Sequence, residues 1–208
     1  MRRGLLGQEA LIKVTSEYSF ETVLDIGSGE GLHADYFERH NKKVTRVDFG
    51  NSVYFRKKPE QTIVKGNYLD IKFENQFDLI WACHVLEHQL NVNFFLKKIK
   101  QDLKPKGILC ITVPPLKNRI VGGHLSLWNA GILLYNLVLA GFSCEGARVK
   151  RYNYNISVIL ENSDVEFPSL EYDCGDVNKL KHFFPKPLYN YNEDMKEGFM
   201  GNINDLNW

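Results

Sequence analysis

Short apolar runs alternate with amphipathic segments over the first 160 or so residues of the chain. Short apolar or β-branched runs predict strands at 22–27, 43–49, 62–66, 77–83 and 107–114. Apolar positions at helical spacing predict helices at 4–16, 32–40, 91–103 and 129–142. Strand, helix and strand in this repeated order predict right-handed crossovers, and therefore a doubly wound, mostly parallel α/β sheet with helices on both faces.

The pattern changes after residue 143. Segments 144–152 and 154–161 are separated by almost nothing, which predicts an antiparallel hairpin at the edge of the sheet. We therefore expect one domain over residues 1–161. Residues 162–208 form an irregular extension whose many aromatic residues predict packing on the domain, over an acceptor cleft or as a homodimer contact.

Composition narrows the classes of function. The chain has 208 residues with 26 Lys and Arg against 25 Asp and Glu, a balance that argues against a large nucleic-acid footprint. Its four cysteines form no CxxC pair, and the start of the chain lacks the apolar core of a secretory signal, so we expect reduced thiols and a cytoplasmic location. The most apolar stretch, GILLYNLVLAGF, is about half the length of a membrane span and predicts a core helix.

The stretch VLDIGSGEG (23–31) places three glycines at every second position after an apolar strand, with Asp25 two residues ahead of the first. A glycine-rich turn is the simplest interpretation. A nicotinamide dinucleotide site needs glycines spaced two and then three apart, and an acid here would repel a pyrophosphate. A ligand with an ammonium group and a nucleoside fits better, because Asp48 ends the next strand and can accept hydrogen bonds from both ribose hydroxyls. S-adenosylmethionine is such a ligand.

Four motifs in order carry a family resemblance: VLDIGSGEG, the strand end at Asp48, GNYLD (66–70) and FDLIWACHVLEH (77–88). Over residues 20–161 the chain resembles class I S-adenosylmethionine-dependent methyltransferases, whose sheet has seven strands and ends in a hairpin. The resemblance implies the site residues, which are Asp25, Gly27 and Gly29 at the methionine moiety with Ser28 beside them, Asp48 at the ribose, Phe49, Asn67 and Tyr68 around the adenine, and Cys83 with His84 near the methyl group. Asn67 stands where the family often has an acid.

Residues 84–88 also spell H-x-x-E-H, which matches a metalloprotease signature. That chemistry needs both histidines inside a helix and a third ligand downstream, whereas this segment begins at the end of a buried strand. We therefore expect no metal here. Glu87 and His88 either cap and orient the loop or face the site.

A hydroxyl acceptor needs a base, and histidine is the usual choice near neutral pH. His84 and His124 are the first candidates and His88 is the third; the segment GGHLSLW around His124 is similar to a Gly-His pair common in this group of methyltransferases. The sequence thus predicts a methyltransferase that acts on a small-molecule or glycan acceptor, most simply at a hydroxyl. A subunit that binds S-adenosylmethionine without catalysis, and a nicotinamide oxidoreductase, are the alternatives.

Overall fold

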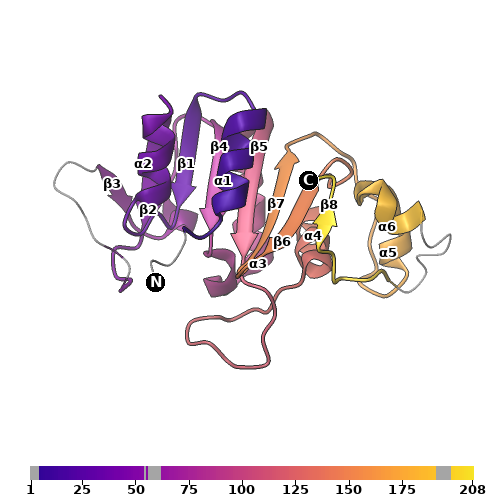
Figure 1. Ribbon diagram of the computed structural model, residues 1–208. Coiled ribbons are helices and arrows are strands. Elements are labelled where there is room, and N and C mark those ends of the chain that lie inside the picture. Colours follow the sequence, from indigo (N-terminus) through magenta and orange to yellow (C-terminus); the bar gives the residue numbers. More distant parts are fainter. Residues whose placement is uncertain (1–4, 54, 56–61, 191–197) are drawn as a thin grey trace.

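The computed structural model describes residues 5–53, 55, 62–190 and 198–208, and a central sheet organises them (Figure 1). In these ranges the sheet has eight strands in the order β3-β2-β1-β4-β5-β7-β6-β8. The strands are β1 (Thr22–Ile26), β2 (Lys43–Asp48), β3 (Ile63–Lys65), β4 (Phe77–Cys83), β5 (Leu103–Val113), β6 (Arg148–Tyr152), β7 (Asn155–Glu161) and β8 (Asp205–Leu206). The first five pair in parallel, and β7, β6 and β8 add antiparallel strands. The doubly wound fold with a terminal hairpin is confirmed, but the sheet has one strand more than the seven predicted.

Helices cover both faces of the sheet. The longer ones are α1 (Gln8–Glu17), α2 (Leu32–Arg39), α3 (Val92–Asp102) and α4 (Ala130–Leu139), and the short ones are η1 (Tyr68–Asp70), η2 (Leu86–His88), α5 (Asp176–Lys179), η3 (Lys181–Phe183) and α6 (Lys186–Asn190). Apolar residues of α1 and α2 pack with Trp81 of β4, whereas those of α3 and α4 pack with its neighbour Ile80. Because successive strand residues point to opposite faces, β4 is buried on both, as its apolar residues 79–83 predict.

Strand β5 begins four residues earlier than the predicted strand. The sequence LKPKG (103–107) reads as a turn, yet Leu103 already pairs with Phe77 across an irregularity in the register. Lys106 takes a φ of 61°, and its amide donates to the carbonyl of Asn162. The segment stays in the sheet because the carbonyl of Asn162, far along the chain, accepts the hydrogen bond that the bulged backbone would leave unpaired.

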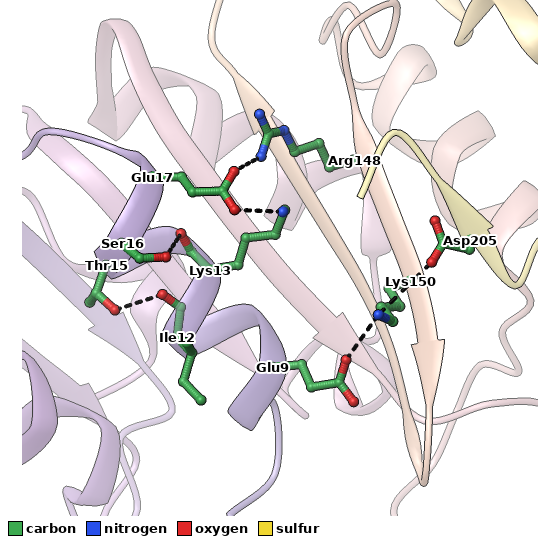
Figure 2. Close-up of polar contacts among 9 residues, drawn as sticks. All are labelled: Glu9, Ile12, Lys13, Thr15, Ser16, Glu17, Arg148, Lys150 and Asp205. Carbon is green, nitrogen blue, oxygen red and sulfur yellow. Dashed lines mark hydrogen bonds and ion pairs between the residues drawn. The ribbon is translucent and has the colours of Figure 1, made fainter.

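Helix α1 lies against the terminal hairpin, and Figure 2 shows its polar contacts. Glu17 pairs with Arg148 of β6, and Lys150 of the same strand lies 3.3 Å from Glu9 and 3.9 Å from Asp205 of β8. Exposed ion pairs contribute little to stability. The buried apolar face of α1 therefore supplies most of its docking energy.

The described part of the extension packs on α4 and on the outer edge of the sheet. Phe184 is fully buried, and the amide of Gly131 in α4 donates to the carbonyl of Gly201 at 2.9 Å. Strand β8 pairs with β6, at the opposite side of the sheet from β3 (Figure 1). In the described ranges no helix is both long enough and apolar enough to cross a membrane.

Candidate active site

The loop between β1 and α2 is shaped by glycines in the left-handed region. The φ angles of Gly27, Gly29 and Gly31 are 71°, 53° and 78°. A Cβ on Gly27 would stand 2.4 Å from Cγ2 of Val85, so this residue also needs to be glycine on steric grounds. The backbone amides of Gly27 and Ser28 donate hydrogen bonds to the carbonyl of Val47, at 2.8 and 3.1 Å. The loop is thus fixed to the end of β2.

Asp48 ends β2 and holds the same loop through its side chain. Its Oδ2 accepts a hydrogen bond of 2.9 Å from the amide of Gly29, and its Oδ1 accepts one of 2.7 Å from Gly50. A carboxylate oxygen accepts more than one hydrogen bond, so both oxygens keep capacity for hydroxyl donors. The next residue, Phe49, is 59% exposed, which leaves its ring free to stack beside whatever Asp48 binds.

Asp25 lies beneath the loop, almost completely buried. Its Oδ2 has no hydrogen-bond partner among the described residues, and the same is true of the buried hydroxyl of Ser28. Burial raises the pKa of Asp25 to about 7, although the charge of Arg46 and a hydrogen bond from the Ala34 amide oppose that rise. A cation above the loop would stabilise the ionised form of this carboxyl.

The two residues expected around an adenine from η1 are already engaged. The Asn67 side chain accepts a hydrogen bond from the amide of Leu69 and so caps η1. Tyr68 is buried, and its hydroxyl donates to Oδ2 of Asp102 in α3 at 2.7 Å. Burial and that carboxylate raise the pKa of Tyr68. The Tyr68 hydroxyl is therefore turned toward α3.

Cys83 is the last residue of β4, beside the start of α1. A Cβ on Gly7 would meet its Sγ at 2.9 Å, so the two segments are in close contact. Burial raises the pKa of the Cys83 thiol well above its ordinary value. This cysteine therefore stays a neutral thiol and is unsuited to act as a nucleophile.

His84 follows with a φ of 56°, a conformation that histidine adopts more readily than most side chains do. Its Nε2 lies 3.0 Å from Oδ1 of Asn155, and that oxygen also accepts the amide hydrogen of Gly7. Because the Gly7 amide donates to Oδ1 of Asn155, this atom is the acceptor oxygen of the side-chain amide. Nε2 of His84 must therefore carry the proton of its own hydrogen bond to Oδ1. Its Nδ1 lies 3.2 Å from Oε1 of Glu87. In the neutral ring Nδ1 therefore presents a lone pair toward the Glu87 carboxylate, while Asn155 holds Nε2.

The loop after β5 brings His124 to η2. The Glu87 carbonyl accepts the amide hydrogen of Leu125 at 2.7 Å, and Nδ1 of His88 lies 2.6 Å from the carbonyl of Gly123. The rings of His88 and His124 meet edge to face, 5.0 Å apart. Burial lowers the pKa of His124. The three candidate histidines and Glu87 thus gather at the carboxyl ends of β4 and β5.

Sequence reasoning did not find Asn155, which joins the start of α1 to His84. An Asn at the start of a hairpin strand usually indicates a turn, and only the pairing of β7 with β5 brings it beside β4.

Sequence reasoning also missed a cavity of about 240 Å³ between the loop after β5 and the extension. Its lining residues are Pro115, Leu116, Trp128, Asn129, Ala130, Arg151, Ile156, Asn202 and Ile203.

Comparison with known proteins agrees with this geometry. Residues 24–111 match the family described as "Methyltransferase domain". The ubiquinone biosynthesis O-methyltransferase of Rickettsia canadensis (strain McKiel) is 31% identical over 122 residues, which are 53% of this chain and 52% of that protein. The protein of the same name from Rickettsia bellii (strain OSU 85-389) is 27% identical over 192 residues, 88% of this chain and 72% of the relative. The chain thus spans about half of the first relative and nearly three quarters of the second.

A solved structure shares the fold. The 1,6-didemethyltoxoflavin-N1-methyltransferase of Burkholderia thailandensis, whose crystal holds S-adenosylhomocysteine, has a TM-score of 0.61 at 20% identity and covers 76% of this chain and 78% of its own. The domain match over residues 24–111, the relatives and the shared fold together support a class I S-adenosylmethionine-dependent methyltransferase. The family resemblance drawn from the sequence is confirmed. The cofactor of this class is S-adenosylmethionine.

The residues around the glycine loop fit that cofactor. The partnerless oxygen of Asp25 and the spare acceptor capacity of Asp48 suit an ammonium group and ribose hydroxyls, respectively. The exposed ring of Phe49 suits a flat base. No pyrophosphate-binding cation stands at the start of α2, whose first turn carries an acid, Asp35.

Proposed function

We propose that this protein transfers the methyl group of S-adenosylmethionine to a hydroxyl oxygen of a small-molecule or glycan acceptor. One juxtaposition supports this most strongly. The glycine loop follows β1, and Asp48 is the last residue of β2. The histidines lie in the segments that follow β4 and β5. These four strands are parallel neighbours. Their carboxyl ends share one edge of the sheet, where ligands of such folds bind.

In this proposal the residues of the chain bind and orient the two reactants. Asp48 accepts hydrogen bonds from the ribose hydroxyls, and Asp25 faces the ammonium group from below. The glycine backbone allows the cofactor to approach closely. When bound, S-adenosylmethionine supplies the methyl group, so an acceptor oxygen forms a C–O bond as the C–S bond breaks and its electron pair stays on sulfur. Holding the reactants in line supplies most of the acceleration.

The acceptor proton passes to the histidine cluster. Asn155 fixes Nε2 of His84, and Nδ1 of the same ring lies against the buried Glu87 carboxylate, which makes this residue better suited to position the cluster than to take the acceptor proton. His88 and His124 are more exposed than Glu87, and each has a ring nitrogen within 4.8 Å of the ligand atoms of the other two side chains. We therefore assign proton removal to this pair.

Two relatives support an oxygen acceptor, since both are named as O-methyltransferases. Their identity to this chain is too low to carry over ubiquinone precursors as the substrate. The test is calorimetry with S-adenosylmethionine and S-adenosylhomocysteine, followed by an assay of S-adenosylhomocysteine release with catechols, other phenols and hexoses as acceptors.

We expect binding of both ligands and a loss of affinity of at least about tenfold in Asp48→Ala, because each hydrogen bond to a charged group contributes about 1.5–3 kcal/mol. Asp70→Ala is the control, because Asp70 is an exposed residue of η1, which follows β3. Absence of cofactor binding would refute the proposal. Binding without turnover on any acceptor would favour a non-catalytic subunit.

A further inference from the structure

Three metal-ligating side chains converge at η2, although the sequence predicted no metal there. Glu87, His88 and His124 each offer one ligand atom, and these atoms lie within 4.8 Å of one another. The sequence argument looked for two histidines inside a helix and a third ligand downstream. The structure supplies the set differently, because the loop after β5 delivers His124 to Glu87 and His88.

The hydrogen bonds of His88 decide which of its nitrogens can bind a cation. Its Nδ1 faces the carbonyl of Gly123 at 2.6 Å, and a carbonyl only accepts, so Nδ1 carries the proton. In the neutral ring Nε2 therefore presents a lone pair, and it lies 3.8 Å from Oε1 of Glu87. Two electron-rich atoms thus face each other with no hydrogen bond between them.

The buried Glu87 carboxylate makes this arrangement energetically unfavourable unless a cation binds beside it. Its side chain is fully buried, and neither carboxylate oxygen has a hydrogen-bond partner among the described residues. Nδ1 of His84 lies 3.2 Å from Oε1 of Glu87, and this contact is an ion pair only when His84 is protonated. A buried carboxylate without hydrogen bonds loses several kcal/mol of solvation, which a bound cation would recover.

The surroundings hold the ligand atoms in place, as the outer contacts of metal sites do. The bond from Nδ1 of His88 to Gly123 fixes that ring, and the amide of Leu125 holds the Glu87 backbone. Gly123 has a φ of 82°, and a Cβ there would lie 3.2 Å from Nδ1 of His88, so the loop fits closely over the ring. The ring of His84 lies beside the same carboxylate, with its Nδ1 3.2 Å from Oε1 of Glu87.

We propose that Glu87, His88 and His124 form a binding site for one divalent first-row transition-metal ion, with Zn²⁺ as the best match. Two imidazoles and a carboxylate are the ligand types that zinc takes when it keeps a fourth position open. Ligand atoms bound to one zinc ion lie about 3.4 Å apart, so the set must contract by rotation of the half-buried His124 ring.

A role for this ion rests on the function proposed above. A hydroxyl bound in the open position would release its proton to solvent more readily, because a bound divalent ion lowers the pKa of an oxygen ligand. With the ion present, His88 and His124 would act as ligands, and the ion would take over the activation of the acceptor. Metal binding itself can be measured without any acceptor.

The test uses the full chain, freed of metal with a chelator and titrated with Zn²⁺ by calorimetry and with Co²⁺ by visible absorption. We expect one site per chain and a Co²⁺ spectrum of low coordination number. His88→Gln and His124→Asn should each weaken binding at least tenfold, since loss of an outer contact alone costs 10–100-fold at known sites. His40→Gln is the matched control, because His40 is the exposed residue that follows α2 and stacks on Tyr36.

S-adenosylmethionine affinity serves as the check on folding in every variant and should stay unchanged. Metal affinity that is equal in wild type, His88→Gln and His124→Asn, or lowered as much by His40→Gln, would overturn the site. Failure of the proposed function has a different signature, which is metal uptake without cofactor binding. Turnover by the metal-free protein at an unchanged rate would overturn the catalytic role of the ion.

Discussion

Oδ2 of Asp48 accepts a 2.9 Å hydrogen bond from the amide of Gly29, so the end of β2 fixes the loop that follows β1. The bond from Gly50 to Oδ1 completes the arrangement. One carboxylate therefore organises two backbone turns, and its remaining lone pairs are those that the proposed function assigns to ribose hydroxyls. This double role makes Asp48 a sensitive position.

Asp48→Asn should lower both stability and cofactor affinity. An amide can replace only one of the two carboxylate oxygens as an acceptor, and its NH₂ would face a backbone N–H. We expect a loss of about 1–3 kcal/mol in the free energy of unfolding, measured by urea denaturation. Asp70→Asn is the control; an Asp48→Asn protein as stable as that control would contradict the role of Asp48 in holding the loop.

Gly27→Ala should abolish cofactor binding and destabilise the protein. Its Cβ would stand 2.4 Å from Cγ2 of Val85, and the φ of 71° is unfavourable for alanine. Thermal unfolding and calorimetry would measure the two effects. Gly146→Ala, where a Cβ meets nothing within 4 Å, should change neither. Wild-type cofactor affinity in Gly27→Ala would show that the loop is not packed as described.

Asp25 should make stability depend on pH. Its pKa is about 7 in the folded protein against an ordinary value of 3.8, so between these values the folded state holds a proton that the unfolded state has lost. Stability therefore falls as pH rises from about 4 to 7, by up to about 4 kcal/mol, and levels off above that. Urea denaturation at pH 5 and pH 8 should show the fall in wild type and a smaller one in Asp25→Asn.

The same carboxyl predicts how cofactor affinity changes with pH. Only the ionised form attracts an ammonium group, so affinity for S-adenosylmethionine should increase as pH rises through 7, and binding near pH 6 should release a proton. Calorimetry in buffers of different ionisation enthalpy would detect the proton. An Asp25→Asn protein with the wild-type pH profile would exclude Asp25 as the origin.

Tyr68→Phe separates a structural role from a cofactor contact. The hydroxyl of Tyr68 donates to Asp102, so its removal should cost about 1 kcal/mol of stability. Because that hydroxyl points toward α3, we expect S-adenosylmethionine affinity to stay the same. A clear loss of affinity by calorimetry would instead support the adenine contact that the family resemblance implies.

Asn155→Ala tests whether Asn155 positions His84. The variant removes the acceptor shared by Nε2 of His84 and the amide of Gly7, which frees the ring and loosens the start of α1. Turnover should fall at least tenfold while the KM for S-adenosylmethionine stays close to wild type. Asn155→Asp keeps the acceptor and should recover much of the rate. Equal loss in both variants would point to a packing effect.

The sequence by itself determined the order of elements, and it placed the proposed cofactor residues at the ends of neighbouring strands. Strand and helix periodicities are local, and each apolar run between 22 and 114 became a strand because its residues suit burial on one or both faces of a sheet. The glycine loop and Asp48 were predictable for a related reason. They stand at the ends of adjacent strands, and parallel pairing alone brings such ends together.

Only the tertiary structure decided the rest. Strand β8 forms because the chain returns to β6 some 45 residues after β7 ends, and no local pattern in two residues encodes that pairing. The convergence of Glu87, His88 and His124, and the bond between His84 and Asn155, depend on a loop and a hairpin that meet η2 from distant parts of the chain. Such contacts follow from long-range packing, because the side chains that create them are neighbours in space and not in sequence.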